Sequence, residues 1–427
     1  MPPTAAQIER AARAWGIETD YWDIWGKQHR ASPELESAIL ESLGVDLKSG
    51  AALEEAIERR GQRQWRSPLA PTIFLTAGLP QEILVSLPAN DNPRAFVRIQ
   101  LEDGNRFEAE VPLEVAATGG RVLLPADLPL GYHQLTLTID DHTFGPARLI
   151  VCPARAYEPD WLHNGRAAGL AISLYGLRSQ RNWGCGDTTD LKTLIDWVAE
   201  RSDTSFIAVN PLHAIANRQP YNTSPYLPNS IFYRNPIYLD IEAIPDFARC
   251  PGAIELFWSA PVQKQIARMR ESELVEYEQV YALKLRFLKL LFERFLDEWR
   301  DLTPRAAQLK EYIANEGDLL HRFAVHSALD RAIHRRCSEV WNWKSWPEQY
   351  QDPDSPATKE FARRHWRSVL FFKYVQWQLD LQLADAQQHA LDRGLRIGLY
   401  HDLALATDRF GSDLWAHRDF FVSGCRV

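Results

Sequence analysis

The chain has 427 residues, of which 45% are hydrophobic and 24% charged, and its formal net charge is −8. This composition is typical of globular proteins, and the length predicts two or three domains. An acidic chain argues against broad binding to nucleic acid, which requires basic surfaces. No apolar run is long enough to predict a membrane span, and the N-terminus lacks the pattern of a secretory signal. We therefore expect a cytoplasmic protein that has neither nucleic acid nor membrane as a partner.

The cysteines suggest neither a metal site nor a disulfide framework. There are five of them, an odd number, and they lie far apart in the chain. Their spacing matches no metal-binding motif, and reduced thiols are expected in the cytosol. The sequence therefore predicts no metal ligands among them.

Residues 1–66 are predicted to form an N-terminal helical region. The segments "TAAQIERAARAWGI", "SPELESAILESLGV" and "GAALEEAIERRG" carry apolar residues at helical spacing. Ser32 is a favourable N-cap, and Gly16 and Gly44 stand where the first two helices should end.

Residues 67–153 are predicted to form an antiparallel β-sandwich domain. Short alternating runs such as "EILVSLP", "AFVRIQLED" and "YHQLTLTID" are separated by turn-forming residues. Several short strands at such spacing are typical of a sandwich.

Residues 154–427 show a third pattern, which predicts an α/β domain with a parallel sheet. Three apolar runs, "AAGLAISLYGL", "SFIAVNPL" and "LRIGLYHDLAL", resemble strands buried on both faces. The amphipathic segment "DTTDLKTLIDWVAER" separates the first two, which gives a β-α-β unit. A helical insertion at about 251–393 precedes the third strand and is predicted to end at Gly394.

Ligands of parallel α/β folds bind at the carboxyl ends of the strands. This rule selects the segments Tyr175–Asp187, Asn210–Tyr238 and His401–His417. In the first, Trp183 either faces a ligand or packs inside the protein. In the third, Asp402 follows a buried strand, where a carboxylate needs a partner. That partner is a ligand, a cation, a hydrogen-bond donor or a salt bridge to a neighbouring loop.

The second segment contains "SPYLPNS", residues 224–230, between "VNPLHA" and "NPIYLDIE". Pro225 and Pro228 restrict the backbone on both sides of Tyr226. Such a loop presents the tyrosine with little entropy left to lose, which suits stacking on a sugar ring. The alternative is a stiff structural loop around a buried tyrosine.

These motifs resemble those of the bacterial amylomaltases, the 4-α-glucanotransferases. The similarity includes "SLYGLRSQRNWGCGD", "VNPLHA", "SPYLPNS", "NPIYLDIE" and "IGLYHDLALATDRFGSDLWAH", and it runs in the same order along essentially the whole chain. The resemblance implies an α-amylase-type (β/α)₈ barrel and a retaining transfer of α-1,4-glucan segments between maltooligosaccharides, without a cofactor. Retention uses two carboxyl groups about 5–5.5 Å apart, one as nucleophile and one as acid/base.

The resemblance assigns substrate-binding roles to five residues. Tyr226 matches the family's tyrosine that stacks on the sugar, and Asp402 matches the carboxylate after the third barrel strand. Ser224, Trp183 and His213 lie in matching loops.

The family's three catalytic carboxylates have no counterpart in this sequence. The family's nucleophile lies in an "RIDH" motif, which does not occur here, and only about three barrel strands are predicted. The expected fold is therefore an incomplete barrel with a large helical insertion, preceded by the helical segment and the sandwich. We expect a fragment without catalytic residues, inactive by itself. The alternatives are a non-catalytic α-glucan-binding protein and a glycoside hydrolase of the same clan.

Overall fold

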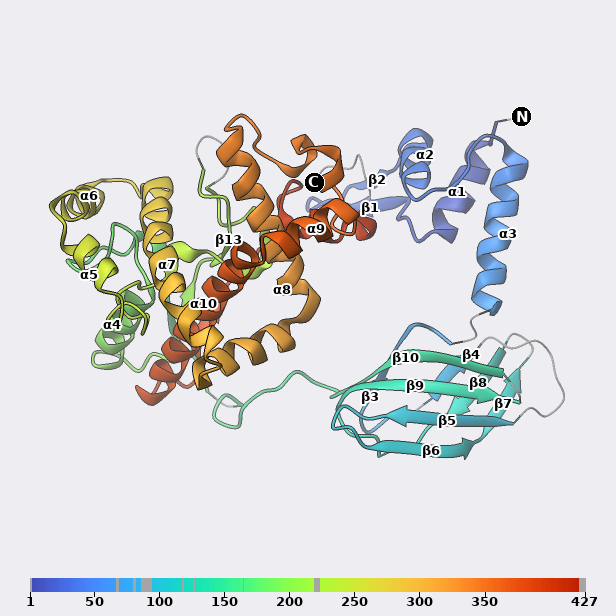
Figure 1. The fold of residues 1–427 in the computed structure, drawn as a ribbon. Helices are drawn as coiled ribbons and strands as arrows, with labels where there is room; N and C mark the ends of the chain where they lie inside the picture. The colour runs from blue at the N-terminus through green and yellow to red at the C-terminus, as the bar shows by residue number, and fades with distance from the viewer. Residues whose placement is uncertain are drawn as a thin grey trace. The chain divides into compact units, whose positions relative to one another are not determined.

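The computed structural model describes residues 2–66, 69–79, 82–85, 94–116, 119–125, 127–140, 142–163, 165–218 and 223–421 (Figure 1). They divide into two compact units, Met1–His163 and Asn164–Phe421. In these ranges, no helix combines the length and the apolar character needed to cross a membrane.

Three helices open the chain: α1 (Ala5–Ala14), α2 (Pro33–Ser42) and α3 (Gly50–Arg66). They share a small core in which Leu40 and Leu53 are fully buried. The predicted N-cap is confirmed, because Ser32 accepts a hydrogen bond from the backbone of Leu35 at 3.3 Å. The left-handed glycines Gly16 and Gly44 end the first two helices, as predicted.

The helical description of residues 1–66 is incomplete, because a hairpin lies between α1 and α2. Its strands are β1 (Asp20–Trp22) and β2 (Gln28–Arg30). The Asp23 carboxylate accepts hydrogen bonds from the backbone of Trp25 and Lys27, both at 2.9 Å. An aspartate that bonds the backbone two residues ahead forms a turn of its own. This turn chemistry, rather than hydrophobic periodicity, determines the structure of the segment.

Eight strands form two sheets over a common core (Figure 1). The five-stranded sheet has the order β3-β10-β9-β5-β6 and the three-stranded sheet β4-β8-β7. Along β5, Ala95, Val97 and Ile99 are buried, whereas the residues between them are not. The strand bounds are β3 (Thr72–Thr76), β4 (Glu82–Val85), β5 (Ala95–Gln100), β6 (Arg106–Val111), β7 (Leu113–Ala116), β8 (Gly119–Leu123), β9 (Gly131–Ile139) and β10 (His142–Cys152).

The prediction of a purely antiparallel sandwich is wrong at one pair. Strands β3 and β10 run parallel, with Thr72 opposite Arg148 and Thr76 opposite Cys152. Short turns require antiparallel pairing only of strands that follow each other in the chain. Because β3 and β10 are the first and the last of the eight, no hairpin sets their relative direction.

The second unit contains the predicted parallel sheet, in the order β11-β12-β15. Its strands are β11 (Gly169–Ile172), β12 (Phe206–Val209) and β15 (Gly398–His401), and both pairings are parallel. Helix α4 (Thr188–Ala199) connects the first two strands, and Asp187 is its N-cap. The predicted β-α-β unit is thus confirmed.

Helices dominate the chain between β12 and β15. They are α5 (Pro251–Trp258), α6 (Ala260–Glu271), α7 (Tyr277–Arg300), α8 (Pro304–Arg336), α9 (Pro356–Arg364) and α10 (Trp366–Asp392), and α11 (Ser412–Ala416) follows β15. Short 3₁₀ turns lie at Leu174–Gly176, Pro236–Tyr238, Trp343–Ser345, Glu348–Tyr350 and Arg418–Phe420. Gly317 has a non-helical backbone and kinks α8. Gly394, with a φ of 92°, follows α10 as predicted.

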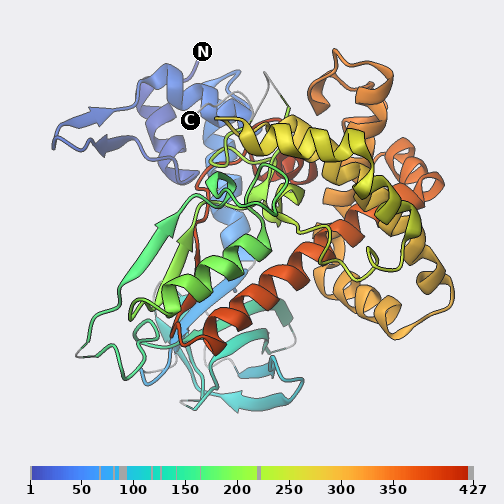
Figure 2. The ribbon, with the colours of Figure 1, turned by 90° about the vertical axis from the view of Figure 1, so that its left-hand side faces the viewer.

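Helices α4 and α10 lie side by side (Figure 2). Thr188 donates a hydrogen bond to Gln382 at 2.6 Å, and Lys192 pairs with Asp385 at the same distance. These contacts join residues almost two hundred positions apart. They bring α10 against the β-α-β unit, and β15 then follows beside β12.

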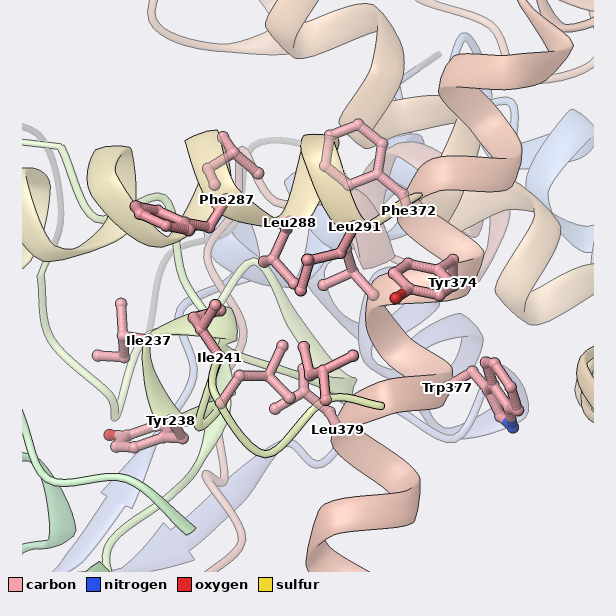
Figure 3. Close-up of a cluster of buried hydrophobic side chains, with 14 of the residues drawn as sticks. Ile237, Tyr238, Ile241, Phe287, Leu288, Leu291, Phe372, Tyr374, Trp377 and Leu379 are labelled. Atoms are coloured by element: carbon pink, nitrogen blue, oxygen red, sulfur yellow. The ribbon is translucent and has the colours of Figure 1, made fainter. Parts of the chain in front are cut away.

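The irregular segment after "SPYLPNS" passes between α7 and α10 (Figure 3). Ile237, Tyr238 and Ile241 are at most 3% exposed. They pack in one core with side chains of α7 such as Leu288 and of α10 such as Leu379. The motif "NPIYLDIE" is therefore part of the core.

Side chains supply the hydrogen bonds that this irregular backbone lacks. The buried ammonium group of Lys284 donates to the carbonyl oxygens of Ile237 and Leu239, at 2.5 and 2.7 Å. Gln376 bonds both the N–H and the C=O of Arg234, at 2.9 and 2.8 Å. Buried backbone groups must be paired, so these side chains make the irregular course of the chain possible.

Replacing Lys284 with methionine tests this account. The change leaves two buried carbonyl groups without a donor, and each unsatisfied group destabilises by about 1–3 kcal/mol. We expect the free energy of unfolding to fall by about 2–5 kcal/mol, measured by urea denaturation with tryptophan fluorescence. The matched control is Lys264→Met at an exposed position of α6, which should change stability by less than about 0.5 kcal/mol. Equal effects of the two changes would contradict the assigned role.

Candidate functional site

Three loops leave the same edge of the parallel sheet. Residues 173–187 follow β11, residues 210–218 and 223–229 follow β12, and residues 402–411 precede α11 after β15. Because the three strands are parallel and adjacent, their carboxyl ends lie together, as in other α/β sites. This edge is the candidate site.

The loop that carries Tyr226 is closed at its base by a small hairpin. Strand β13 (His213–Ala214) pairs with β14 (Ser230–Arg234). At the end of the loop, the N–H of Asn229 donates to the carbonyl oxygen of Ala214 at 2.8 Å. The two ends of the loop are thereby held together.

A second set of bonds fastens the base of this loop to the segment after β15. The carbonyl oxygen of Pro228 accepts hydrogen bonds from the N–H of Asp408 at 2.7 Å and the hydroxyl of Thr407 at 3.0 Å. The carbonyl oxygen of Asn229 accepts from the hydroxyl of Ser412 at 3.0 Å and the N–H of Asp413 at 3.2 Å. We call these four bonds the clasp. The clasp joins the second and third loops of the site.

Tyr226 lies two residues before the clasp in the chain, and its side chain is 58% exposed. Its N–H donates to the hydroxyl oxygen of Ser224 at 3.3 Å, and the N–H of Leu227 donates to the Ser224 carbonyl oxygen. The alternative of a buried tyrosine in a structural loop is therefore wrong. The ring is exposed to solvent on a loop that hydrogen bonds hold at its base.

His213 connects the Tyr226 loop with the segment that follows Asp402. Its imidazole is 4% exposed, and its Nε2 atom accepts a hydrogen bond from the N–H of Ala404 at 3.2 Å. The Nδ1 atom is buried and has no partner among the residues that the structure describes. Since Nε2 accepts, the neutral ring carries its proton on Nδ1.

This environment lowers the pKa of His213 from 6.5 to about 4. Burial is the main cause, and the positive charge of Arg234 acts in the same direction. The carboxylate of Asp402 opposes the shift, which places it within electrostatic reach of the ring. His213 is thus neutral at physiological pH, and protonation would remove the acceptor of the Ala404 bond.

Asp402 extends the sheet through its backbone and exposes its side chain. Its N–H donates to the carbonyl oxygen of Val209 at 3.2 Å. Among the described residues, its carboxylate makes no hydrogen bond or ion pair, so the alternative of a salt bridge to a neighbouring loop is not found there. The premise of burial was wrong for this side chain, because β15 is an edge strand of the described sheet and its last two residues, Tyr400 and His401, are exposed as well.

Trp183 is not part of the exposed site. The indole is 2% exposed and packs against Phe257 and Phe287, with ring centroids 5.8 and 4.9 Å away. Its N–H donates to Glu242 at 3.3 Å. The structure thus corrects the prediction that Trp183 faces a ligand, and it favours the packing alternative. The physical reason is that the glycines around it let the loop fold inward.

Buried charges hold the loop that carries Trp183. Arg181 pairs with Asp187 and, at 3.0 Å, with Asp240. Burial raises the pKa of Asp187 to about 6, although Arg181 and Lys284 act in the opposite direction. A methyl group added at Gly186 would lie 2.1 Å from the carbonyl oxygen of Leu174. This loop is a rigid support for the site.

Sequence reasoning missed Asn210, which links the first two loops. Its Oδ1 atom accepts from the N–H of Leu174 at 2.8 Å, and its Nδ2 atom donates to the hydroxyl of Tyr238 at 3.1 Å. An asparagine at the end of an apolar strand was the available signal. Among the described residues, no three His, Cys, Asp or Glu side chains come together in the way that a metal ion requires.

Two family models match the chain. One, described as 4-alpha-glucanotransferase, covers residues 172–427, and the other, described as MalQ N-terminal beta sandwich domain, covers residues 68–153. The sandwich model therefore matches the segment that contains β3 to β10.

Named relatives and a solved structure are also similar to the chain. The 4-alpha-glucanotransferase of Mycobacterium tuberculosis (strain ATCC 25618 / H37Rv) is 33% identical over 442 residues, which cover 99% of this chain and 59% of that protein. The 4-alpha-glucanotransferase of Haemophilus influenzae is 32% identical, with 78% of this chain and 48% of that protein covered. The crystal structure of amylomaltase from Corynebacterium glutamicum has a TM-score of 0.76 and 28% identity, and the match covers 96% of this chain and 56% of that one. The chain thus spans about half to three fifths of the length of these proteins.

The pKa of His213 predicts how stability depends on pH. Below pH 6.5 the unfolded chain gains a proton on this histidine, whereas the folded chain gains it only near pH 4. Stability should therefore fall as the pH decreases from about 7 to 4, by on the order of 2 kcal/mol from this residue. His213→Gln should flatten the dependence in urea denaturation at pH 7.5, 6 and 5. Burial also lowers the pKa of His326 to about 4, so the stability of the variant should still depend on pH, but less steeply. If stability depended on pH equally in the variant and the original protein, the lowered pKa of His213 would be contradicted.

Gly411 provides a test of the clasp. A methyl group at this position would lie 2.5 Å from the carbonyl oxygen of Asn229 and 2.9 Å from that of Asp408. Gly411→Ala should therefore open the clasp and destabilise the unit by about 1–3 kcal/mol. Limited digestion with chymotrypsin should cut faster after Tyr226. The control is Gly252→Ala, where nothing lies within 4 Å of the added methyl group; equal cutting rates in the two variants would refute the clasp as the brace of the loop.

Proposed function

Because the chain belongs to the 4-alpha-glucanotransferase family, we propose that the protein transfers α-1,4-glucan segments between maltooligosaccharides. The reaction retains the anomeric configuration through two displacements. A carboxylate attacks the anomeric carbon while a carboxylic acid protonates the leaving oxygen, and a glucosyl ester forms. The 4-hydroxyl of a second glucan then displaces the carboxylate and gives its proton to the same acid/base group. We assign neither carboxyl group to a residue of this chain.

The residues of this chain supply substrate binding. The observation that carries this proposal is the exposed ring of Tyr226 on a loop fastened by the clasp, within the part of the chain matched by the transferase model. An immobile aromatic face binds the apolar face of a sugar with little loss of entropy. Asp402, exposed at the end of β15, accepts hydrogen bonds from sugar hydroxyls, and the Ser224 hydroxyl lies beside Tyr226. His213 and Trp183 act from inside the protein by holding the loops.

We also propose that β11, β12 and β15 are strands of an α-amylase-type (β/α)₈ barrel and that the enzyme is cytoplasmic. Parallel pairing and a site at the carboxyl edge support this proposal. In such a barrel the Tyr226 loop lies at the mouth, where substrates enter.

Product analysis distinguishes the transferase from its alternatives. The protein is purified from the cells that naturally produce it and incubated with maltotriose. The products are then separated by chromatography. A transferase gives glucose together with chains longer than maltotriose, and the number of reducing ends stays constant. A hydrolase gives only shorter products and new reducing ends. A glucan-binding protein retains the sugar without products, and either of these two outcomes would refute the proposal.

Tyr226→Ala should weaken substrate binding because the stacking surface is removed. We expect KM for maltotriose to rise about tenfold, the equivalent of about 1.4 kcal/mol. Tyr226→Phe keeps the ring and should stay within about threefold of the original value. The matched control is Tyr157→Ala, at a tyrosine that is 89% exposed in the other unit. If Tyr226→Ala behaved like this control, the loop would have no role in binding.

A further inference from the structure

A groove between α7, α8 and α10 lies outside the three loops of the candidate site. Its volume is about 230 Å³. The aromatic rings of Phe292, Phe371 and Phe372 form its apolar part. Lys289, Arg331, Arg335 and Arg367 contribute the cations around it.

Within the described ranges, three of these cations lack an anionic partner. Among the described residues, Lys289, Arg331 and Arg335 make no ion pair or hydrogen bond through their side chains. Glu293 is the only carboxylate that lines the groove in the described part of the chain, and it pairs with Arg367 at 2.6 Å. The groove is therefore strongly positive on a chain whose formal net charge is −8.

The cations also repel one another. The pKa of Lys289 is lowered by burial and then by the charges of Arg331 and Arg335. The pKa of Arg331 is lowered by burial, with Arg335 and Arg218 acting in the same direction and Tyr281 opposing them. Arg218 itself is paired with Asp330. The cluster thus destabilises the folded chain unless an anion joins it.

A purely structural explanation accounts for only one member of the cluster. Arg335 lies in the last turn of α8, where a positive charge interacts favourably with the helix dipole. Lys289 is in the middle of α7, and Arg331 precedes the last turn of α8. Neither gains from a helix end, and both are only partly exposed.

We propose that this groove binds a phosphate group, either the free ion or the phosphate of a small ester. A phosphate carries up to two negative charges and several acceptor oxygens. Arg331 and Arg335 offer planar donor forks, and Lys289 adds a compact positive charge. The groove is smaller than the range of about 300–1,000 Å³ that is typical of drug-sized ligands. It therefore suits a phosphate with at most a small organic group attached.

The first test compares inorganic phosphate, glucose 1-phosphate and glucose at constant ionic strength, which is set with sodium chloride. Isothermal calorimetry and the thermal unfolding temperature are measured with each. We expect saturable binding and a higher Tm with both phosphates and none with glucose. Tighter binding of the ester would identify an organic phosphate as the preferred source, and equal binding would identify the free ion. A phosphate response no larger than that of added chloride would overturn the proposal.

Variants locate the binding in the groove. Lys289→Gln and Arg331→Gln should each raise the dissociation constant at least tenfold, because a charge-assisted contact is lost. Without phosphate at low salt, Lys289→Gln should also raise the Tm, since one repelling charge is removed. A destabilised apo form or unchanged phosphate affinity in Lys289→Gln would refute the site.

The control for these variants is Arg286→Gln. Arg286 is exposed on the same helix as Lys289 but does not line the groove. Its replacement removes one positive charge from the chain and should leave phosphate affinity within about twofold. An equal loss of affinity in Arg286→Gln would show that overall charge, rather than the groove, governs the response, and the proposal would fall.

Discussion

The structure of the second unit depends on hydrogen-bond partners for the N–H and C=O groups of a buried backbone segment that is neither helix nor strand. Residues 235–242, which follow β14, are mostly buried and make few regular backbone hydrogen bonds, although a buried unpaired N–H or C=O group is strongly unfavourable. Lys284 supplies two donors, and Gln376 and Gln382 each bond both backbone groups of one residue, Arg234 and Asp240 respectively. Long helices are therefore needed beside this segment, because they hold such side chains in fixed positions.

The hydrogen bonds from α7 and α10 to the buried segment also make the candidate site rigid. The segment held by α7 and α10 continues directly from β14, whose pairing with β13 closes the base of the Tyr226 loop. The clasp adds bonds from the segment after β15, and His213 adds one more through Ala404. An exposed tyrosine on a loop would otherwise lose much conformational entropy on binding. Here the hydrogen bonds at the base of the loop restrict its backbone before any ligand binds, which lowers this cost.

Charged side chains such as Arg181 have partners of opposite charge in the core, whereas, in the described part of the chain, most of the cations in the groove between α7, α8 and α10 do not. Arg181 is paired with Asp187 and Asp240, and Arg305 is paired with Asp246 and Glu298. These pairs satisfy charges that would be expensive to bury alone. Among the described residues, Lys289, Arg331 and Arg335 of the groove have no such partners, whereas Arg367 pairs with Glu293. A phosphate group accounts for both their position and their missing partners.

The sequence by itself determined the local elements and the family. Ser32 as an N-cap, Gly394 after the last long helix and the three apolar strands of the parallel sheet were all predicted, because each depends on neighbouring residues. The tertiary structure alone decided the parallel pairing of β3 with β10, the burial of Trp183 and the exposure of Asp402. It also decided that Gln376 binds Arg234, 142 residues earlier. Such contacts form between segments that are far apart in the sequence, so neither the local spacing of residues nor their secondary-structure propensity predicts them.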